Sequence, residues 1–209
     1  MADANPQGIL FAGADEWVRD LAKTIKNAGF NVTLVDTNYS HISEAKMLGL
    51  PAYCASILSD YVREELDLAG IGNFVALTRN DEVNELGVNE FSHVFGRKNV
   101  YRLPLNDKSK GRRAALGGKT RGRLLFDGNW GEKRIFQAYQ NGWRVKSTKL
   151  TEEFGFEQFK ENYGEDYLIV AAIENKKLMI ATVDNPLVPA TGQTLISFVK
   201  APASRAAST

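Results

Sequence analysis

The sequence predicts an α/β fold: a Rossmann-like doubly wound parallel sheet with a second, smaller, mostly β domain. Three observations carry this prediction. Short apolar segments alternate with amphipathic, helix-like segments over residues 1–105, a pattern typical of parallel strands with right-handed crossovers. A glycine turn directly follows the first apolar segment, and Asp36 ends the second. Beyond residue 123, short apolar segments flank turn-like residues, as in antiparallel strands.

The first domain is expected to alternate strands and helices throughout. The helix after the first strand places Trp17, Leu21 and Ile25 at helical spacing, and Gly29 ends it. Ser40 is expected to cap the second helix, because its hydroxyl can accept from helix N–H groups. The expected strands lie at residues 8–12, 32–35, 52–55, 74–77 and 99–103.

Two more helices are expected in this domain. One covers roughly residues 60–68, and another is capped by Asn80 or Asp81 and runs to Gly96. Carboxylates at such a helix start are explained by capping and by the helix dipole. The remaining segments are a basic, glycine-containing linker, a small mostly β domain and a disordered tail, at residues 106–123, 124–200 and 201–209.

The second domain is expected to be built from short strands. A hairpin turns at residues 174–177, and a short amphipathic segment carries several aromatic residues, which we expect to lie in the core. The expected strands lie at residues 144–149, 167–173, 178–183 and 194–199.

The glycine turn is a partial dinucleotide-binding fingerprint. Gly13 remains, but Asp15 and Val18 stand where the second and third glycines would fall. The second glycine lets the backbone approach a pyrophosphate, and Asp15 places a carboxylate near the expected phosphate instead. Asp36 lies 23 residues after Gly13, about where such units place the acid that binds the ribose hydroxyls.

Charge is distributed unevenly along a chain whose formal net charge is only +1. Residues 97–123 carry ten basic side chains and one acidic side chain. Such a segment is typical of a solvated linker, and it would also be attracted to anionic lipid or to an acidic partner. Because it lacks interleaved aromatic residues that could stack on bases, nucleic acid is not an expected partner.

The remaining composition predicts a cytoplasmic protein. A single cysteine, Cys54, excludes an internal disulfide, and its neighbours Tyr53 and Ala55 suggest an inert thiol in a buried strand. No apolar stretch approaches the about 20 residues that span a bilayer, and no signal peptide is expected before the first strand. His41 and His93 have no His or Cys at ligand spacing, so no metal site is expected.

Several segments resemble the RCK family, also called KTN or TrkA-N. They lie at residues 8–23, 35–38, 49–53 and 76–84. Trp17 in the turn, residues 77–84 and Phe-Gly-Arg at 95–97 are similar to the branch fused behind the membrane domain of bacterial sodium/proton antiporters.

This resemblance implies a cytoplasmic regulatory domain that forms a homodimer and controls a monovalent cation/proton antiporter. The antiporter would lie upstream in the native chain and tether the domain to the inner face of the cell membrane. The implied ligand is an adenine nucleotide, AMP or NAD/NADH, with ADP and ATP also possible.

The resemblance also implies a nucleotide site at the carboxyl edge of the sheet. The backbone at the glycine turn would face phosphate, and Asp36 would bind ribose and disfavour the 2′-phosphate of NADP. Trp17 would wall the phosphate pocket or lie in the helix core, and Arg79 would pair with phosphate, neutralise Asp15 or lie free on the surface. The implied site residues are Gly13, Ala14, Asp15, Trp17, Asp36, Thr37, Asn38, Ala55, Ser56, Ile57, Thr78, Arg79 and Asn80.

Two other function classes stay open from the residues alone. A small NAD-dependent oxidoreductase would need a near-neutral base, and only His41 and His93 are available for that role. Both are better explained as solvated or packed side chains, and we expect the chain not to be an enzyme. An interaction scaffold that has lost nucleotide binding is the other alternative, which Asp15 and Val18 favour.

Overall fold

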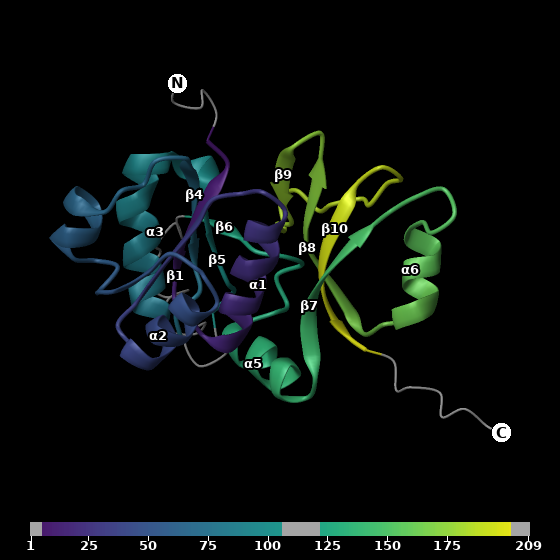
Figure 1. The fold of residues 1–209 in the computed structure, drawn as a ribbon, viewed down its shortest axis with the longest axis horizontal. Coiled ribbons are helices and arrows are strands. Elements are labelled where there is room, and N and C mark those ends of the chain that lie inside the picture. Colours follow the sequence, from purple (N-terminus) through teal and green to yellow (C-terminus); the bar gives the residue numbers. More distant parts are fainter. Residues whose placement is uncertain (1–5, 106–121, 202–209) are drawn as a thin grey trace, which may run out of the picture.

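The structure is a computed structural model that describes residues 6–105 and 122–201. It contains a six-stranded parallel sheet of order β3-β2-β1-β4-β5-β6 and a four-stranded antiparallel sheet of order β7-β10-β8-β9 (Figure 1). The parallel sheet has the doubly wound order, which reverses direction between β1 and β4. The predicted fold class is therefore confirmed. Of the expected linker (106–123) and tail (201–209), residues 106–121 and 202–209 lie outside the described residues.

Elements of the parallel sheet alternate along the chain as the sequence pattern predicts. In order they are β1 (Gly8–Ala12), α1 (Glu16–Asn27), β2 (Val32–Asp36), α2 (Tyr39–Met47), β3 (Ala52–Cys54), a π-helical turn (Tyr61–Glu65), β4 (Ile71–Ala76), α3 (Asp81–Phe95), a 3-10 turn (Arg97–Asn99), β5 (Val100–Arg102) and β6 (Arg123–Leu124).

The second sheet has two helices of its own. Its elements are α5 (Glu132–Gln140), β7 (Trp143–Lys149), α6 (Phe156–Tyr163), β8 (Tyr167–Glu174), β9 (Lys177–Ile180) and β10 (Thr194–Lys200). The hairpin between β8 and β9 forms where the sequence predicts it. Phe159 is fully buried on α6, with a tilted ring contact to Tyr163 and an edge-to-face contact to Tyr167, so the aromatic residues of this segment do pack as core.

Four sequence expectations differ from the structure. The helix expected at residues 60–68 is only the short π-helical turn, because Leu66 already has extended backbone angles. Asn38 rather than Ser40 caps α2, since its side chain accepts from two helix N–H groups. Cys54 is exposed rather than buried, because it ends a three-residue strand at the sheet edge. The sequence patterns also did not predict α5 or β6.

Different elements pack against the two faces of the parallel sheet. Ile9 and Phe11 of β1 point into a core shared with α1 and with the second sheet, which contributes Ile196 and Phe198. Leu10 alternates to the opposite face, where it packs in a core with residues of α3. The second sheet thus covers part of the face on which α1 lies, and α1 runs between the two sheets in Figure 1.

β6 leads from the parallel sheet to the segment that follows β9. Arg123 and Leu124 pair in parallel with β5, and the next residue, Leu125, forms an antiparallel bridge with Thr182. Arg123 Nη2 also donates to Thr182 Oγ1 at 2.9 Å. The predicted boundary between linker and second domain, at residues 123 and 124, lies inside this strand.

Candidate nucleotide site

A cavity of about 500 Å³ opens at the carboxyl edge of the parallel sheet, between the loops that follow β1, β2, β3 and β4. Its position is the point where the strand order reverses, which is where open α/β sheets bind ligands. Its volume lies within the range of small-molecule sites. Of the thirteen residues that the sequence suggests, twelve line this cavity: Gly13, Ala14, Asp15, Asp36, Thr37, Asn38, Ala55, Ser56, Ile57, Thr78, Arg79 and Asn80.

Gly13 forms the tight turn on which this cavity depends. Its φ is +108°, which side-chain-bearing residues rarely adopt, and a Cβ there would lie 2.8 Å from the carbonyl oxygen of Leu77. Its N–H donates to the carbonyl of Val35 at 2.8 Å. Only glycine therefore lets the loop after β1 run this close to the end of β4.

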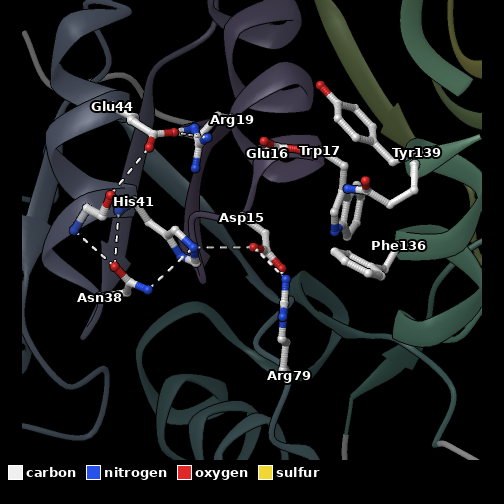
Figure 2. Close-up of a pocket in the computed structure, with 12 residues that line it drawn as sticks. Asp15, Glu16, Trp17, Arg19, Asn38, His41, Glu44, Arg79, Phe136 and Tyr139 are labelled. Atoms are coloured by element: carbon white, nitrogen blue, oxygen red, sulfur yellow. Dashed lines mark hydrogen bonds and ion pairs between the residues drawn. The ribbon is translucent and has the colours of Figure 1, made fainter. Parts of the chain in front are cut away.

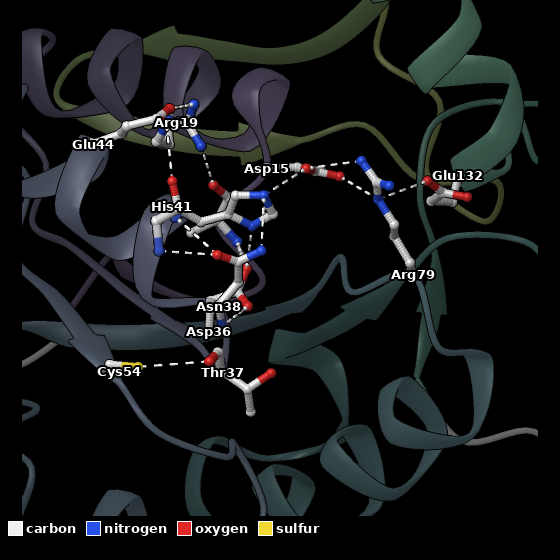
Figure 3. A network of polar contacts seen from close by, with 12 residues as sticks. Asp15, Arg19, Asp36, Thr37, Asn38, His41, Glu44, Cys54, Arg79 and Glu132 are labelled. Carbon is white, nitrogen blue, oxygen red and sulfur yellow. Dashed lines mark hydrogen bonds and ion pairs between the residues drawn. The ribbon is translucent and has the colours of Figure 1, made fainter.

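Asp36 organises one side of the cavity. Its carboxylate accepts from the backbone N–H groups of Ala14 and Asn38, each at 2.8 Å. His41 Nδ1 lies 3.1 Å from the same carboxylate (Figure 3). The residue expected to bind ribose thus also ties the glycine turn to the start of α2.

Asp15 and Arg79 form an ion pair across the cavity. Arg79 donates to both Asp15 oxygens, with Nε–Oδ2 and Nη2–Oδ1 distances of 2.7 Å and 3.0 Å. This hydrogen bonding raises the pKa of Arg79 above its ordinary value. The Asp15 side chain is 12% exposed and the Arg79 side chain 56%. Of the roles considered for Arg79, the structure shows neutralisation of Asp15.

Arg79 also reaches the second domain through α5. Its Nε lies 3.6 Å from Glu132 Oε1, and its guanidinium carbon lies 4.7 Å from the centre of the Phe136 ring. Burial raises the pKa of Glu132, and the nearby Arg79 charge opposes that shift. Since the sequence patterns did not predict α5, they gave no signal for these two contacts.

The sequence predicts a solvated or packed role for His41, whereas the structure places His41 in the lining of the cavity. Its Nε2 lies 3.5 Å from Asp15 Oδ1, while its Nδ1 faces Asp36. A neutral imidazole can donate from only one ring nitrogen, whereas the protonated ring can donate from both. His41 lies between the two carboxylates of the site, on the helix that Asn38 caps.

The polar residues after β4 are mainly held by their own loop. Asn80 caps α3 by accepting from the N–H groups of Glu82 and Val83. Thr78 donates through its hydroxyl to Asn84 Oδ1 at 2.6 Å, and Asn84 returns a bond to the Thr78 carbonyl. These bonds fix the loop that carries Arg79.

Trp17 does not line the main cavity. It is 4% exposed, lies in the core between the sheets, and borders a second cavity of about 310 Å³ beside α1 (Figure 2). This cavity meets the first at Asp15, Asn38, His41 and Arg79, and its far side is formed by α5.

Within residues 6–105 and 122–201, no helix combines the length and the apolar character needed to cross a membrane. His, Cys, Asp and Glu side chains in these ranges form no group of three or more placed to hold a metal ion.

Comparison with known proteins gives a family for about the first half of the chain, because the TrkA-N domain family model matches residues 9–110. A comparison with curated proteins found no match.

Among solved structures, the chain is similar to the NAD(P)-binding domain of an exopolyphosphatase-related protein from Archaeoglobus fulgidus. The identity is 17% and the TM-score 0.45, over 65% of this chain and 96% of that chain. It is also similar to the GsuK channel bound to NAD, at 13% identity and a TM-score of 0.45, over 96% of this chain and 39% of that chain. The chain thus spans well under half of the GsuK channel chain.

The strand order of the parallel sheet shows the fold, and the family match shows the domain family. The matched region contains the glycine turn, Asp36 and the loop after β4 that together line the main cavity. Residues 9–110 of this chain are therefore a TrkA-N domain.

Proposed function

We propose that this chain is a regulatory unit that binds an adenine nucleotide and controls a monovalent cation/proton antiporter. The observation that supports it best is the cavity at the strand reversal, which brings Asp36 and the glycine turn together in a TrkA-N domain. In this proposal the ribose binds Asp36, the adenine lies against residues 55–57, and the phosphate approaches Arg79.

The route from ligand to second domain would run through Arg79. This arginine contacts Asp15 of the glycine turn and both Glu132 and Phe136 of α5. A ligand that engages Arg79 would change these contacts, but it shifts the equilibrium only if it binds the two arrangements with different affinity. We propose that a homodimer transmits this change to an antiporter at the inner face of the membrane, and that the role is regulatory rather than catalytic.

Thermal unfolding with AMP, ADP, ATP, NAD, NADH and NADPH tests nucleotide binding. A ligand at 100 times its dissociation constant adds about 2.7 kcal/mol of stability. We expect at least one adenine nucleotide to raise the melting temperature, NADPH to have no effect, and Asp36→Asn to abolish the rise. Asp67→Asn is the matched control, because Asp67 likewise accepts from the N–H two residues further along, at 3.0 Å, but does not line the cavity.

Cys54 provides an independent readout. It is the single thiol of the chain and is exposed, with its Sγ 3.6 Å from the carbonyl of Thr37 at the cavity rim. A nucleotide in the cavity should slow alkylation of Cys54. Unchanged melting temperature and alkylation with every nucleotide would contradict the proposal and favour an interaction scaffold. Turnover of a substrate by the purified chain would contradict the regulatory role.

A further inference from the structure

The Asp15–Arg79 ion pair affects which nucleotides can bind in the main cavity. Asp15 belongs to the loop after β1 and Arg79 to the loop after β4, so their pair spans the crevice between these loops. A dinucleotide places its pyrophosphate across this crevice, at the start of the first helix. The Asp15 carboxylate, with a side chain only 12% exposed, lies in that path.

Three donors beside this path already face carboxylates of the protein. Arg79 binds Asp15, the N–H of Ala14 binds Asp36, and His41 lies between both acids. A ligand phosphate must therefore compete with these carboxylates for these three donors, whereas the N–H groups at the start of α1 carry no side-chain cap.

The charge around the two joined cavities is acidic. Among the described residues that line them or contact Arg79, five carboxylates face two guanidinium groups and one imidazole. Arg19 is itself bound to Glu44, which leaves Arg79 as the arginine that faces the main cavity. Each phosphate added to a ligand thus brings negative charge toward Asp15 without a further arginine among these residues to meet it.

We propose that Asp15 determines ligand specificity: the cavity takes adenosine or AMP, with at most one phosphate, and rejects ADP, ATP and NAD. The inference rests on the proposed nucleotide site and names its ligand class. The adenosine half lies on the Asp36 side of the ion pair. A single 5′-phosphate reaches Arg79 in exchange for Asp15, and a longer phosphate chain meets the displaced carboxylate.

Isothermal titration calorimetry at pH 7 and low salt tests this with adenosine, AMP, ADP, ATP and NAD. We expect the wild type to bind AMP at least tenfold more tightly than ADP, ATP or NAD. Asp15→Gly, which restores the fingerprint glycine, should reduce that ratio at least tenfold while leaving adenosine affinity unchanged. Asp15→Asn keeps the bulk and removes the charge, so its ratio measures how much of the selectivity is electrostatic.

Glu16→Gln is the control, because it removes a neighbouring carboxylate that is exposed and lines only the second cavity. Its ratio should stay within about threefold of the wild-type ratio, because an exposed carboxylate is screened by solvent and salt. The melting temperature of each unliganded variant shows that it is folded. The same AMP-to-NAD ratio in the wild type and in Asp15→Gly would overturn the inference alone. Absence of binding by the wild type and both Asp15 variants would overturn the proposed function as well.

Discussion

Three helices begin at the carboxyl edge of the parallel sheet, and one of them begins differently. α2 and α3 each follow an asparagine whose side chain accepts from two helix N–H groups, Asn38 and Asn80. α1 follows Asp15, which makes no such bond and directs its carboxylate to Arg79 instead. Two loops therefore stabilise their helices, while the third leaves its helix N–H groups uncapped beside the cavity.

α1 is held by contacts along its length instead of by a cap. Arg19 is buried and donates to the carbonyl of Ala14 at 2.6 Å, and it also binds Glu44 of α2. Further along, Asp20 accepts from the N–H of Val145 in β7 at 3.0 Å. The start of α1 thus stays uncapped beside the cavity while the helix is anchored elsewhere along its length.

The largest effect is expected from Gly13→Ala, which would break the turn before α1. The positive φ and the 2.8 Å approach to the Leu77 carbonyl together should cost about 3 kcal/mol of unfolding free energy in urea. Gly29→Ala is the control, because Gly29 has a φ of +96° but no atom within 4 Å of the added Cβ. We expect it to cost about 1 kcal/mol. Equal costs would show that the close approach does not matter.

An intermediate effect is expected from Asp20, which tests the anchoring of α1 on the second sheet. Asp20→Ala leaves the Val145 N–H without its acceptor and should cost about 1 to 2 kcal/mol. Asp20→Asn keeps an acceptor oxygen and should cost less than about 0.5 kcal/mol at pH 7. If Asp20→Ala also cost less than that, α1 would not depend on this bond.

The same residue gives a pH dependence with a defined sign. Burial raises the pKa of Asp20 above its ordinary value of 3.8. Between 3.8 and the higher folded-state pKa, the native protein binds more protons than the unfolded chain, so this group makes stability rise as pH falls. Asp20→Asn should remove that contribution. A difference between wild type and variant that stays constant across this pH range would contradict the raised pKa.

Much of this edge could be predicted from sequence because it depends on local patterns. In a parallel sheet the carboxyl ends of the strands lie at the same edge. This places three features together: the glycine after the first strand, the acid that ends the second, and the polar residues after β4. The contacts of Arg79 with Glu132 and Phe136 could not be predicted, because they join residues more than fifty positions apart through a short helix with two buried residues. The position of His41 likewise depends on which residue caps α2.

The smallest effects on unfolding free energy are expected from substitutions at the residues that precede α3 and α1. Asn80→Ala removes two side-chain bonds to helix N–H groups and should cost about 1 kcal/mol of unfolding free energy in urea. Asp15→Ala removes no cap bond and breaks a pair whose arginine is exposed, so it should cost no more than about 0.5 kcal/mol. A cost for Asp15→Ala equal to that for Asn80→Ala would mean that Asp15 stabilises α1 after all. A smaller cost would support the view that Asp15 is there for the ligand site, since the helix does not need it.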